Sequence, residues 1–310
     1  MTTTTLLNQW TLEDFIEVWI NAFLVDRKAQ NVSPGTLKFY NTKLGLFADY
    51  CESQQVKQIS QITPTMLREF LLYLEEHGHN PGGIHACFRS VRTLLNWFEQ
   101  EMEPEGWKNP IHKVKAPKVP QEILEPADIS DVQRMIDTCK TDFLGRRDKA
   151  IFLFLLDTGV RASELLAIRR DEINLITGQV LIRMGKGRKP RFVYLGQKAR
   201  KVLRAYVKTR HDECPYLFTS DNQDKLSYWG LKMMVRRRAK QARVKTPQVH
   251  AFRRWFALNY LRSGGDVYSL AGLMGHSPSS VQVLFKYLKL TENDLRMSHD
   301  RTSLVDDLNH

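Results

Sequence analysis

Residues 150–166 of the chain read AIFLFLLDTGVRASELL. Their apolar run predicts a buried helix that stops at Thr158-Gly159, because glycine readily takes the left-handed backbone that closes a helix. A second, short helix is expected to begin near Ala162, which leaves Arg161 at its N-terminus. There the guanidinium charge adds to the free backbone amides of the helix end. The stretch therefore predicts a helix–helix corner that suits anion binding.

Around this corner, the second half of the chain predicts more helices and one hairpin. The apolar spacing favours helices near 127–138, 197–209, 227–242, 248–262, 266–274 and 278–288. Residues 179–184 and 191–195 alternate or run apolar on either side of Gly185-Lys186-Gly187-Arg188-Lys189, which predicts a β-hairpin. Because strands are few, we expect a mainly α fold with a small β-sheet.

The first 100 residues predict four amphipathic helices that share a core. Their expected starts are Thr11, Ser33-Pro34, Thr63-Pro64 and the residues after Pro81-Gly82-Gly83. The first of these helices is expected to carry Leu12, Phe15, Ile16 and Trp19. Nothing in this part of the sequence suggests catalysis.

A change in composition separates the two parts. Five prolines between positions 104 and 126 stiffen the chain and interrupt helices. A chain of 310 residues is long enough for two cores. We expect a first domain at 1–112, a linker at 113–124 and a second domain at 125–310. Four lysines between positions 104 and 126 could touch phosphates: Lys108, Lys113, Lys115 and Lys118.

The net charge of +12 is unevenly distributed along the chain. Residues 1–115 hold 11 basic and 13 acidic residues, whereas residues 116–310 hold 35 and 21. A concentrated positive charge attracts nucleic acid, although a merely soluble basic domain has the same composition. Within it, Arg236 and Arg237 lie in a basic run on an expected helix. They either contact the DNA backbone or are simply solvated.

The sequence gives no sign of a membrane segment or of disulfides. No apolar run reaches the roughly 18 residues that span a bilayer, and the start lacks the pattern of a signal peptide. The four cysteines are scattered without pairing or zinc spacing. We therefore expect a reduced, cytoplasmic protein.

Six residues of the second half form a candidate set for phosphodiester chemistry: Arg161, Lys186, His250, Arg253, His276 and Tyr287. A guanidinium binds two phosphate oxygens in a fork and keeps its proton. Arg161 and Arg253 are therefore candidates for holding the charge of a transition state. Glu164, one turn after Arg161, could orient it or a neighbouring imidazole, and an ordinary surface ion pair is the alternative.

The other four candidates supply proton transfer and a nucleophile. His250 precedes Arg253 by three residues, so both share one helix face. Lys186 at the hairpin tip could protonate a leaving 5′ oxygen, but Arg188, Lys189 and Arg191 compete for that role.

His276 and Tyr287 lie near the end of the chain. Gly275 is expected to close a helix, which puts His276 at a tight corner where capping is its alternative role. A phenol has a pKa of about 10, so attack by Tyr287 needs a base, for which His250 is the candidate. Simple packing is the alternative for this tyrosine.

Carboxylates with magnesium-ligand spacing and a Gly-Lys-Ser/Thr loop are both missing from the sequence. We therefore expect no metal, no ATP and no other cofactor.

Together these motifs resemble the signature of the tyrosine recombinases, the phage integrase family that includes the Xer-type resolvases. The resemblance rests on Asp157–Leu166, Gly185-Lys186-Gly187, His250–Arg253, Leu273–His276 and Tyr287, and it covers essentially the whole chain. It implies a four-helix, SAM-like core-binding domain that clamps DNA, followed by a catalytic domain.

The resemblance also implies a reaction. Tyr287 would attack the scissile phosphate to form a 3′-phosphotyrosyl link, with Arg161 and Arg253 clamping the phosphate. Lys186 would be the general acid, His250 an acid or base, and His276 a hydrogen-bond donor. A homotetramer would join two specific double-stranded DNA sites through a Holliday junction in the nucleoid. Contacts of Lys113, Lys115, Lys118, Arg188, Lys189, Arg236 and Arg237 with DNA are expected.

Two departures from the family pattern are visible. Eleven residues separate His276 from Tyr287, slightly more than usual, and Arg254 stands where many relatives have a histidine. The tail after Thr291 is expected to pack on a neighbouring protomer through Leu295, Leu304 and Leu308.

Two other functions fit parts of the pattern. A type IB topoisomerase uses nearly the same chemistry but needs no second DNA site. A DNA-binding accessory protein would have a silent active site, although here every catalytic position is filled.

Overall fold

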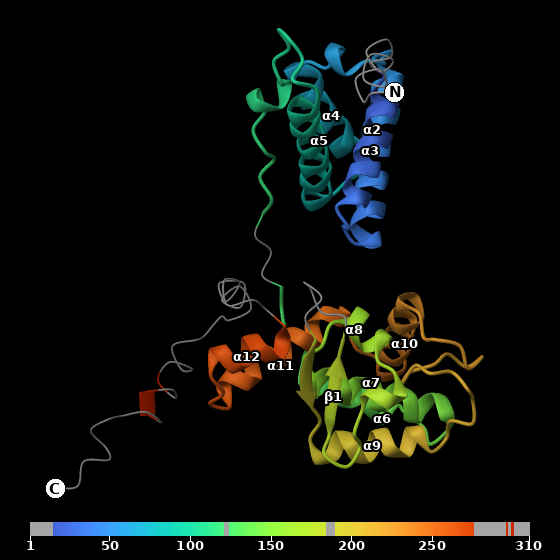
Figure 1. The fold of residues 1–310 in the computed structure, drawn as a ribbon. Helices are drawn as coiled ribbons and strands as arrows, with labels where there is room; N and C mark the ends of the chain where they lie inside the picture. Colours follow the sequence, from blue (N-terminus) through green and yellow to red (C-terminus); the bar gives the residue numbers. More distant parts are fainter. Residues whose placement is uncertain (1–14, 121–123, 184–189, 276–295, 297–298, 301–310) are drawn as a thin grey trace, which may run out of the picture. The chain divides into compact units, whose positions relative to one another are not determined.

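The computed structural model describes residues 15–120, 124–183, 190–275, 296 and 299–300, and it confirms a mainly helical fold (Figure 1). It divides into two compact units, Met1–Glu122 and Ile123–His310. This division falls within the stretch expected to be the linker. No helix in the described ranges is both long and apolar enough to span a membrane.

The first unit contains α2 (Ile16–Ala29), α3 (Pro34–Ser53), α4 (Pro64–Glu76) and α5 (Pro81–Met102), with short 3-10 helices at Ile59–Gln61 and Pro110–Lys113. Two of the four predicted helix starts, Ser33-Pro34 and Thr63-Pro64, are confirmed by their caps, whereas the fourth helix begins at Pro81, earlier than predicted. Ser33, Thr63 and Asn80 each accept a hydrogen bond from a backbone amide in the first turn. Such side-chain acceptors satisfy amides that have no partner within the helix.

The start of the first helix was predicted wrongly. Phe15 does not belong to α2: its backbone is extended and forms an antiparallel bridge with Gln58. The Ile16 amide donates a hydrogen bond to the Lys57 carbonyl at 2.8 Å. The start of α2 is therefore fixed by the segment that precedes α4. Thr11 and Leu12 lie outside the described residues.

Aromatic residues fill the core of the first unit. The Trp19 and Phe98 rings meet edge-on at 4.9 Å, and Phe23 meets Trp97 at 5.6 Å. These pairs join α2 to α5, whose predicted apolar stripe is buried throughout: Ile84, Phe88, Val91, Leu94, Leu95 and Phe98.

The second unit contains most of the predicted elements. In chain order these are α6 (Ile129–Asp137), α7 (Phe143–Thr158), α8 (Ala162–Ala167), η3 (Arg170–Glu172), β1 (Gln179–Ile182), β2 (Arg191–Tyr194), α9 (Gln197–Val207), α10 (Tyr228–Ala242), α11 (Val249–Arg262) and α12 (Val267–Met274). The helix expected at 278–288 lies outside the described residues.

Helix α7 is the centre of this unit and packs against α9 and α11 (Figure 1). Phe152 of α7 stacks on Phe252 of α11 with ring centroids 5.7 Å apart. As α11 carries His250 and Arg253, this contact fixes two candidate residues relative to the helix that leads to Arg161.

The predicted hairpin is confirmed. β1 and β2 pair antiparallel, with Ile182 opposite Arg191 and Val180 opposite Val193. Val193 is fully buried, whereas Phe192 and Tyr194 are exposed. Side chains alternate between the two faces of a strand, so Arg191 shares the inward face of β2 with Val193.

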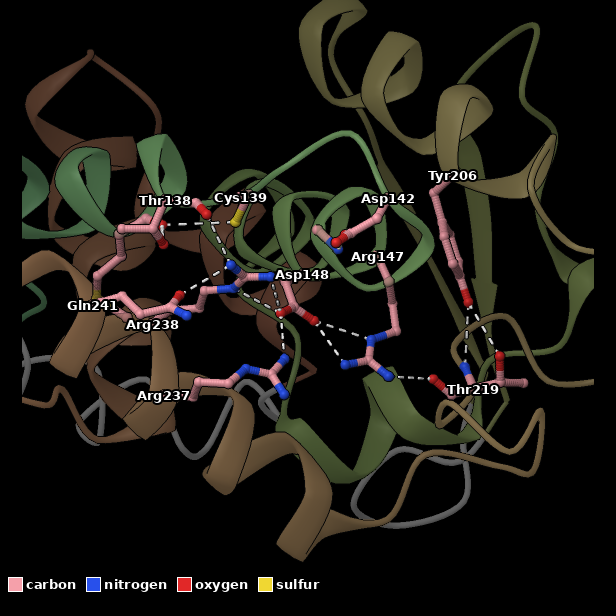
Figure 2. Close-up of polar contacts among 12 residues, drawn as sticks. Thr138, Cys139, Asp142, Arg147, Asp148, Tyr206, Thr219, Arg237, Arg238 and Gln241 are labelled. Atoms are coloured by element: carbon pink, nitrogen blue, oxygen red, sulfur yellow. Dashed lines mark hydrogen bonds and ion pairs between the residues drawn. The ribbon is translucent and has the colours of Figure 1, made fainter.

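A buried carboxylate, Asp148, joins α7 to α10 (Figure 2). Arg147 donates to one of its oxygens, while Arg237 and Arg238 each donate to the other at 2.8 Å. The two buried arginines also donate elsewhere: Arg147 to the Thr219 carbonyl, and Arg238 to the Thr138 carbonyl and to Gln241 Oε1. The basic run on α10 is therefore partly structural, because Arg238 is buried and Arg237 is paired.

Candidate active site

The corner between α7 and α8 is built around Gly159. This residue ends α7 with a φ of +58°, in the left-handed region that the sequence predicts for it. A Cβ here would lie 2.3 Å from the Phe256 ring, closer than any real contact. Only glycine fits, because the position combines a left-handed backbone with a ring against its Cα.

Arg161 caps α8 and is fixed from both ends. Its backbone amide donates to Glu164 Oε2 at 2.8 Å, and its Nη1 donates to Glu164 Oε1 at 2.8 Å. Glu164 therefore orients Arg161, one of the two partners that the sequence left open for it. The Arg161 side chain remains 20% exposed, so part of the guanidinium faces solvent.

Glu164 is the buried anion of the site, with only 1% of its side chain exposed. Burial alone would raise its pKa. Hydrogen bonds from Arg191 and from the Arg161 amide, together with both guanidinium charges, outweigh burial and lower the pKa below its ordinary value. The carboxylate is therefore ionised at neutral pH.

Arg191 is the residue whose role the sequence left most open. Its Nη1 and Nη2 donate to the two oxygens of Glu164 at 3.0 and 2.7 Å, and its Nε donates to the Leu273 carbonyl at 2.8 Å. This guanidinium is held inside the protein, so Arg191 does not compete with Lys186 as a proton donor. The signal was present in the sequence, because strand alternation places Arg191 on the face of buried Val193.

Arg253 on α11 is 3% exposed and is held by two backbone carbonyls. Its Nη1 donates to Gly159 and its Nη2 to Met274, both at 2.6 Å. Arg161 Nη1 also approaches the Met274 carbonyl, at 3.4 Å. The two candidate arginines thus converge on one oxygen at the C-terminus of α12, where the helix dipole is negative.

His250 lies one turn before Arg253 at the N-terminus of α11 and is exposed. Partial desolvation and then the charges of Arg253, Arg254 and Arg161 lower the pKa of its imidazole, and Glu164 opposes them weakly. The ring is therefore neutral at pH 7 and able to accept a proton. Arg254 itself points elsewhere and donates to the Glu125 carbonyl at 2.8 Å.

A pocket of about 540 Å³ opens beside these groups. Its lining includes Arg161 and His250, and also Lys225, Ser227 and Tyr228. These three residues were not singled out in the sequence. Ser227 caps α10 by accepting a hydrogen bond from the Gly230 amide at 3.0 Å, a pattern that the sequence contains but that points equally to a simple helix start.

Several predicted residues lie outside the described part of the chain: Lys186, Arg188, Lys189, His276 and Tyr287, and the tail residues Leu295, Leu304 and Leu308. The structure reaches Gly275, which closes α12 with a φ of +65° as expected. The described chain therefore stops at the helix end whose carbonyls accept from Arg161, Arg191 and Arg253.

The other predicted DNA contacts lie on two separate elements. Lys113, Lys115 and Lys118 are exposed and line a groove of about 640 Å³ in the first unit, where Arg68 donates to the Lys113 carbonyl at 2.9 Å. Arg236 and Arg237 are exposed on α10 of the second unit. The first unit also gathers Arg27, Arg89 and Arg92 around a smaller hollow, a cluster that its neutral composition did not suggest.

The site holds three guanidiniums, those of Arg161, Arg191 and Arg253, and one carboxylate, Glu164, so this group is net positive. Fixed guanidiniums beside a neutral imidazole stabilise an anion that gains charge during a reaction, since they need no reorganisation when it forms. The described part of the site therefore fits chemistry on a phosphate.

Comparison with known sequences supports the same conclusion. The phage integrase family matches residues 127–293, and the phage integrase SAM-like domain matches residues 16–98. The chain is 29% identical over 243 residues to tyrosine recombinase XerA of Thermococcus kodakarensis, covering 77% of this chain and 82% of that protein. It is 27% identical over 301 residues to tyrosine recombinase XerC of Oceanobacillus iheyensis, covering 93% and 95%.

Solved structures show the same fold. The Tn1549 transposon integrase in complex with transposon right end DNA has a TM-score of 0.74 and 16% identity, covering 93% of this chain and 99% of that one. The XerH recombinase bound to a palindromic difH substrate has a TM-score of 0.69 and 19% identity, covering 91% and 83%.

The chain belongs to the phage integrase family, with an N-terminal SAM-like domain and a C-terminal catalytic domain. Its named relatives identify it as a tyrosine-type site-specific recombinase.

Proposed function

We propose that this recombinase cuts and rejoins duplex DNA through Tyr287. The phenolic oxygen attacks the scissile phosphorus, the bond to the 5′ oxygen breaks, and a 3′-phosphotyrosyl link forms. The phenol proton passes to His250, and the leaving 5′ oxygen takes a proton from Lys186. Because the link conserves the energy of the phosphodiester, the reverse reaction reseals the strand without ATP.

The observation that carries this proposal is that Arg161 and Arg253 donate to the same oxygen. Both guanidiniums reach the Met274 carbonyl, at 3.4 and 2.6 Å. Two donors that meet at one oxygen suit a non-bridging oxygen of a phosphate, which carries more negative charge than a carbonyl. We infer that these arginines clamp the scissile phosphate and stabilise its transition state.

His250 supports the proposal through its charge state. Its lowered pKa leaves the imidazole neutral at pH 7, the form that accepts the phenol proton. We assign His276 to hydrogen bonding with the phosphate. Glu164 holds Arg161 through two hydrogen bonds.

At the level of assembly, we propose a homotetramer on two specific DNA sites that passes through a Holliday junction in the cytoplasm, at the nucleoid. The basic residues Lys113, Lys115, Lys118, Arg188, Lys189, Arg236 and Arg237 contact the DNA backbone and set affinity. The tail packs on a neighbouring protomer through Leu295, Leu304 and Leu308.

A nicked suicide substrate tests the chemistry. The DNA is nicked next to the cleavage position, so that cleavage releases a short strand and traps the covalent adduct. We expect adduct with the wild-type protein and none with Tyr287→Phe. Tyr268→Phe is the matched control, because Tyr268 is 76% exposed in the same unit and has no assigned role. Adduct formation by Tyr287→Phe would refute the proposal.

A second measurement separates recombination from DNA relaxation. A recombinase converts two separate sites into a junction and then into exchanged products, whereas a relaxase changes supercoiling on a single duplex. Relaxation without any two-site product would favour the topoisomerase alternative.

A further inference from the structure

Arg191 joins three elements of the second unit. It begins β2, its two Nη atoms bind both oxygens of Glu164 on α8, and its Nε binds the Leu273 carbonyl of α12. Its side chain is only 11% exposed. Three directed hydrogen bonds leave this guanidinium little freedom to turn toward a ligand.

The Glu164 carboxylate is shared between two cations. Oε1 accepts from the Nη1 atoms of both Arg161 and Arg191, and Oε2 accepts from the Arg161 amide and from Arg191 Nη2. A buried carboxylate must be neutralised by a partner. Arg191 does this with a bidentate fork, whereas Arg161 contributes only one guanidinium nitrogen. The charge of Arg161 is therefore only partly used by Glu164.

Arg191 also fixes the end of α12. Besides binding the Leu273 carbonyl, its guanidinium lies against Gly275, where a Cβ would come within 2.8 Å of Nη1. Between these two residues is Met274, whose carbonyl meets Arg161 and Arg253. The oxygen on which the phosphate-binding arginines converge is thus positioned by a contact on each side.

We propose that Arg191 is a positioning residue for strand cleavage. It neutralises Glu164, so that Arg161 keeps its charge for the scissile phosphate. It also holds the C-terminal end of α12 against both phosphate-binding arginines. This role rests on the proposed function of Arg161 and Arg253. Without Arg191, Glu164 turns to Arg161 as its only cation, and the charge available to the phosphate falls.

The first experiment measures single-turnover cleavage of the suicide substrate by the wild-type protein and two variants. We expect Arg191→Met to cleave roughly 10–100-fold more slowly than wild type. This range is typical for residues that orient a functional group without contacting the ligand themselves. Glu164→Gln combined with Arg191→Met removes the unpaired carboxylate and should recover most of the loss. A double variant as slow as Arg191→Met would overturn the neutralisation role.

The second experiment changes the charge of the DNA instead. A methylphosphonate at the scissile position replaces one charged oxygen with a neutral methyl group, so cleavage needs less positive charge. The ratio of wild-type to Arg191→Met rates should therefore shrink toward one on this substrate. An unchanged ratio would mean that Arg191 only maintains the fold, and the proposal would fail.

Two further variants control for folding. Arg147→Met removes a buried arginine from the Asp148 cluster; it should lower the melting temperature and leave the ratio of rates on the two substrates at the wild-type value. Arg191→Lys keeps the positive charge but loses the two-pronged contact with Glu164. It should therefore retain more cleavage than Arg191→Met, and it tests the role of charge even if Arg191→Met folds poorly. Equal losses in Arg191→Lys and Arg191→Met, with wild-type melting temperatures, would contradict the role of charge.

The wild-type protein separates the two ideas. If it forms no covalent adduct, the proposed function is wrong. If it forms the adduct and Arg191→Met cleaves at the same rate, only the role of Arg191 is wrong.

Discussion

Asp148 and Glu164 are both buried carboxylates surrounded by arginines, but the arginines around Asp148 stabilise the fold, whereas Arg161 beside Glu164 belongs to the candidate active site. Around Asp148, the Arg147 and Arg238 side chains are 5% and 6% exposed, and they also donate to backbone carbonyls and to Gln241. Around Glu164, the Arg161 side chain is 20% exposed and lines a pocket. A buried carboxylate alone therefore says little about function; a cation that lines a pocket beside another candidate group, as Arg161 does beside His250, indicates a reactive cluster.

The largest expected effect is on the structural side of this comparison. Asp148→Asn removes the anion shared by three guanidiniums, two of which are buried. Leaving buried charges without their partner typically costs about 3–5 kcal/mol, so the free energy of unfolding should fall by about that amount. Chemical denaturation measures it. Below its melting temperature the variant should still form the covalent adduct at close to the wild-type rate, and a specific loss of cleavage would break the distinction.

Arg161→Ala is the reciprocal test. Loss of one preorganised donor should slow cleavage by about 10²–10³-fold, or about 3–4 kcal/mol of barrier. The melting temperature should change little, because Arg191 still neutralises Glu164 through its fork. Single-turnover rates and melting curves on the same preparation check both statements. A large fall in stability with little loss of rate would place Arg161 among the structural arginines.

The pH dependence of cleavage sharpens the reactive side. His250 has a lowered pKa, so its neutral, proton-accepting form predominates above that value and disappears as the pH falls through it. Cleavage should therefore rise with pH along an acidic limb whose midpoint lies below the ordinary histidine pKa of about 6.5. Rates from pH 4.5 to 8 measure the limb, with His250→Asn as control. A midpoint above 6.5, or a limb that persists in His250→Asn, would contradict the assignment.

The smallest expected difference separates two adjacent arginines of α10. Arg237 binds Asp148 at 2.8 Å with its side chain 44% exposed, whereas Arg236 has no ion pair within the described ranges. Arg237→Gln should therefore lower stability by at most about 1 kcal/mol and Arg236→Gln by nothing measurable. Each should weaken DNA binding for all sequences alike and reduce the salt dependence by about one phosphate contact. Equal stability losses would show that Asp148 does not distinguish them.

Most helix starts and ends could be predicted because the residues that determine them are close together in the sequence. Ser33, Thr63 and Gly159 each act within one turn of their own helix, so their neighbours in the sequence suffice to identify them. The same holds for Arg161 and Glu164, which are one turn apart. The start of α2 was missed because a bond between Ile16 and Lys57 sets it, and that partner is distant in the sequence.

The arginine clusters could not be assigned for the same reason. Arg191 meets a carboxylate 27 residues away, and Arg238 meets one 90 residues away. Periodicity does show that both are inward-facing: Arg191 alternates with exposed Phe192, and Arg238 follows Leu231 and Val235 on the buried stripe of α10. A pattern of this kind predicts that a carboxylate is needed, but only the folded chain identifies which one.

The tight packing around Gly159 has a consequence for mutations at this position. It carries no reactive group, but its carbonyl holds Arg253 and its Cα lies against the Phe256 ring. Even an alanine codon at this position adds a methyl group where the backbone angle and the ring both forbid one. A saturation screen for lost recombination should therefore recover alleles of Gly159 alongside those of the arginines. Such a screen would mark as essential a residue that has no side chain of its own.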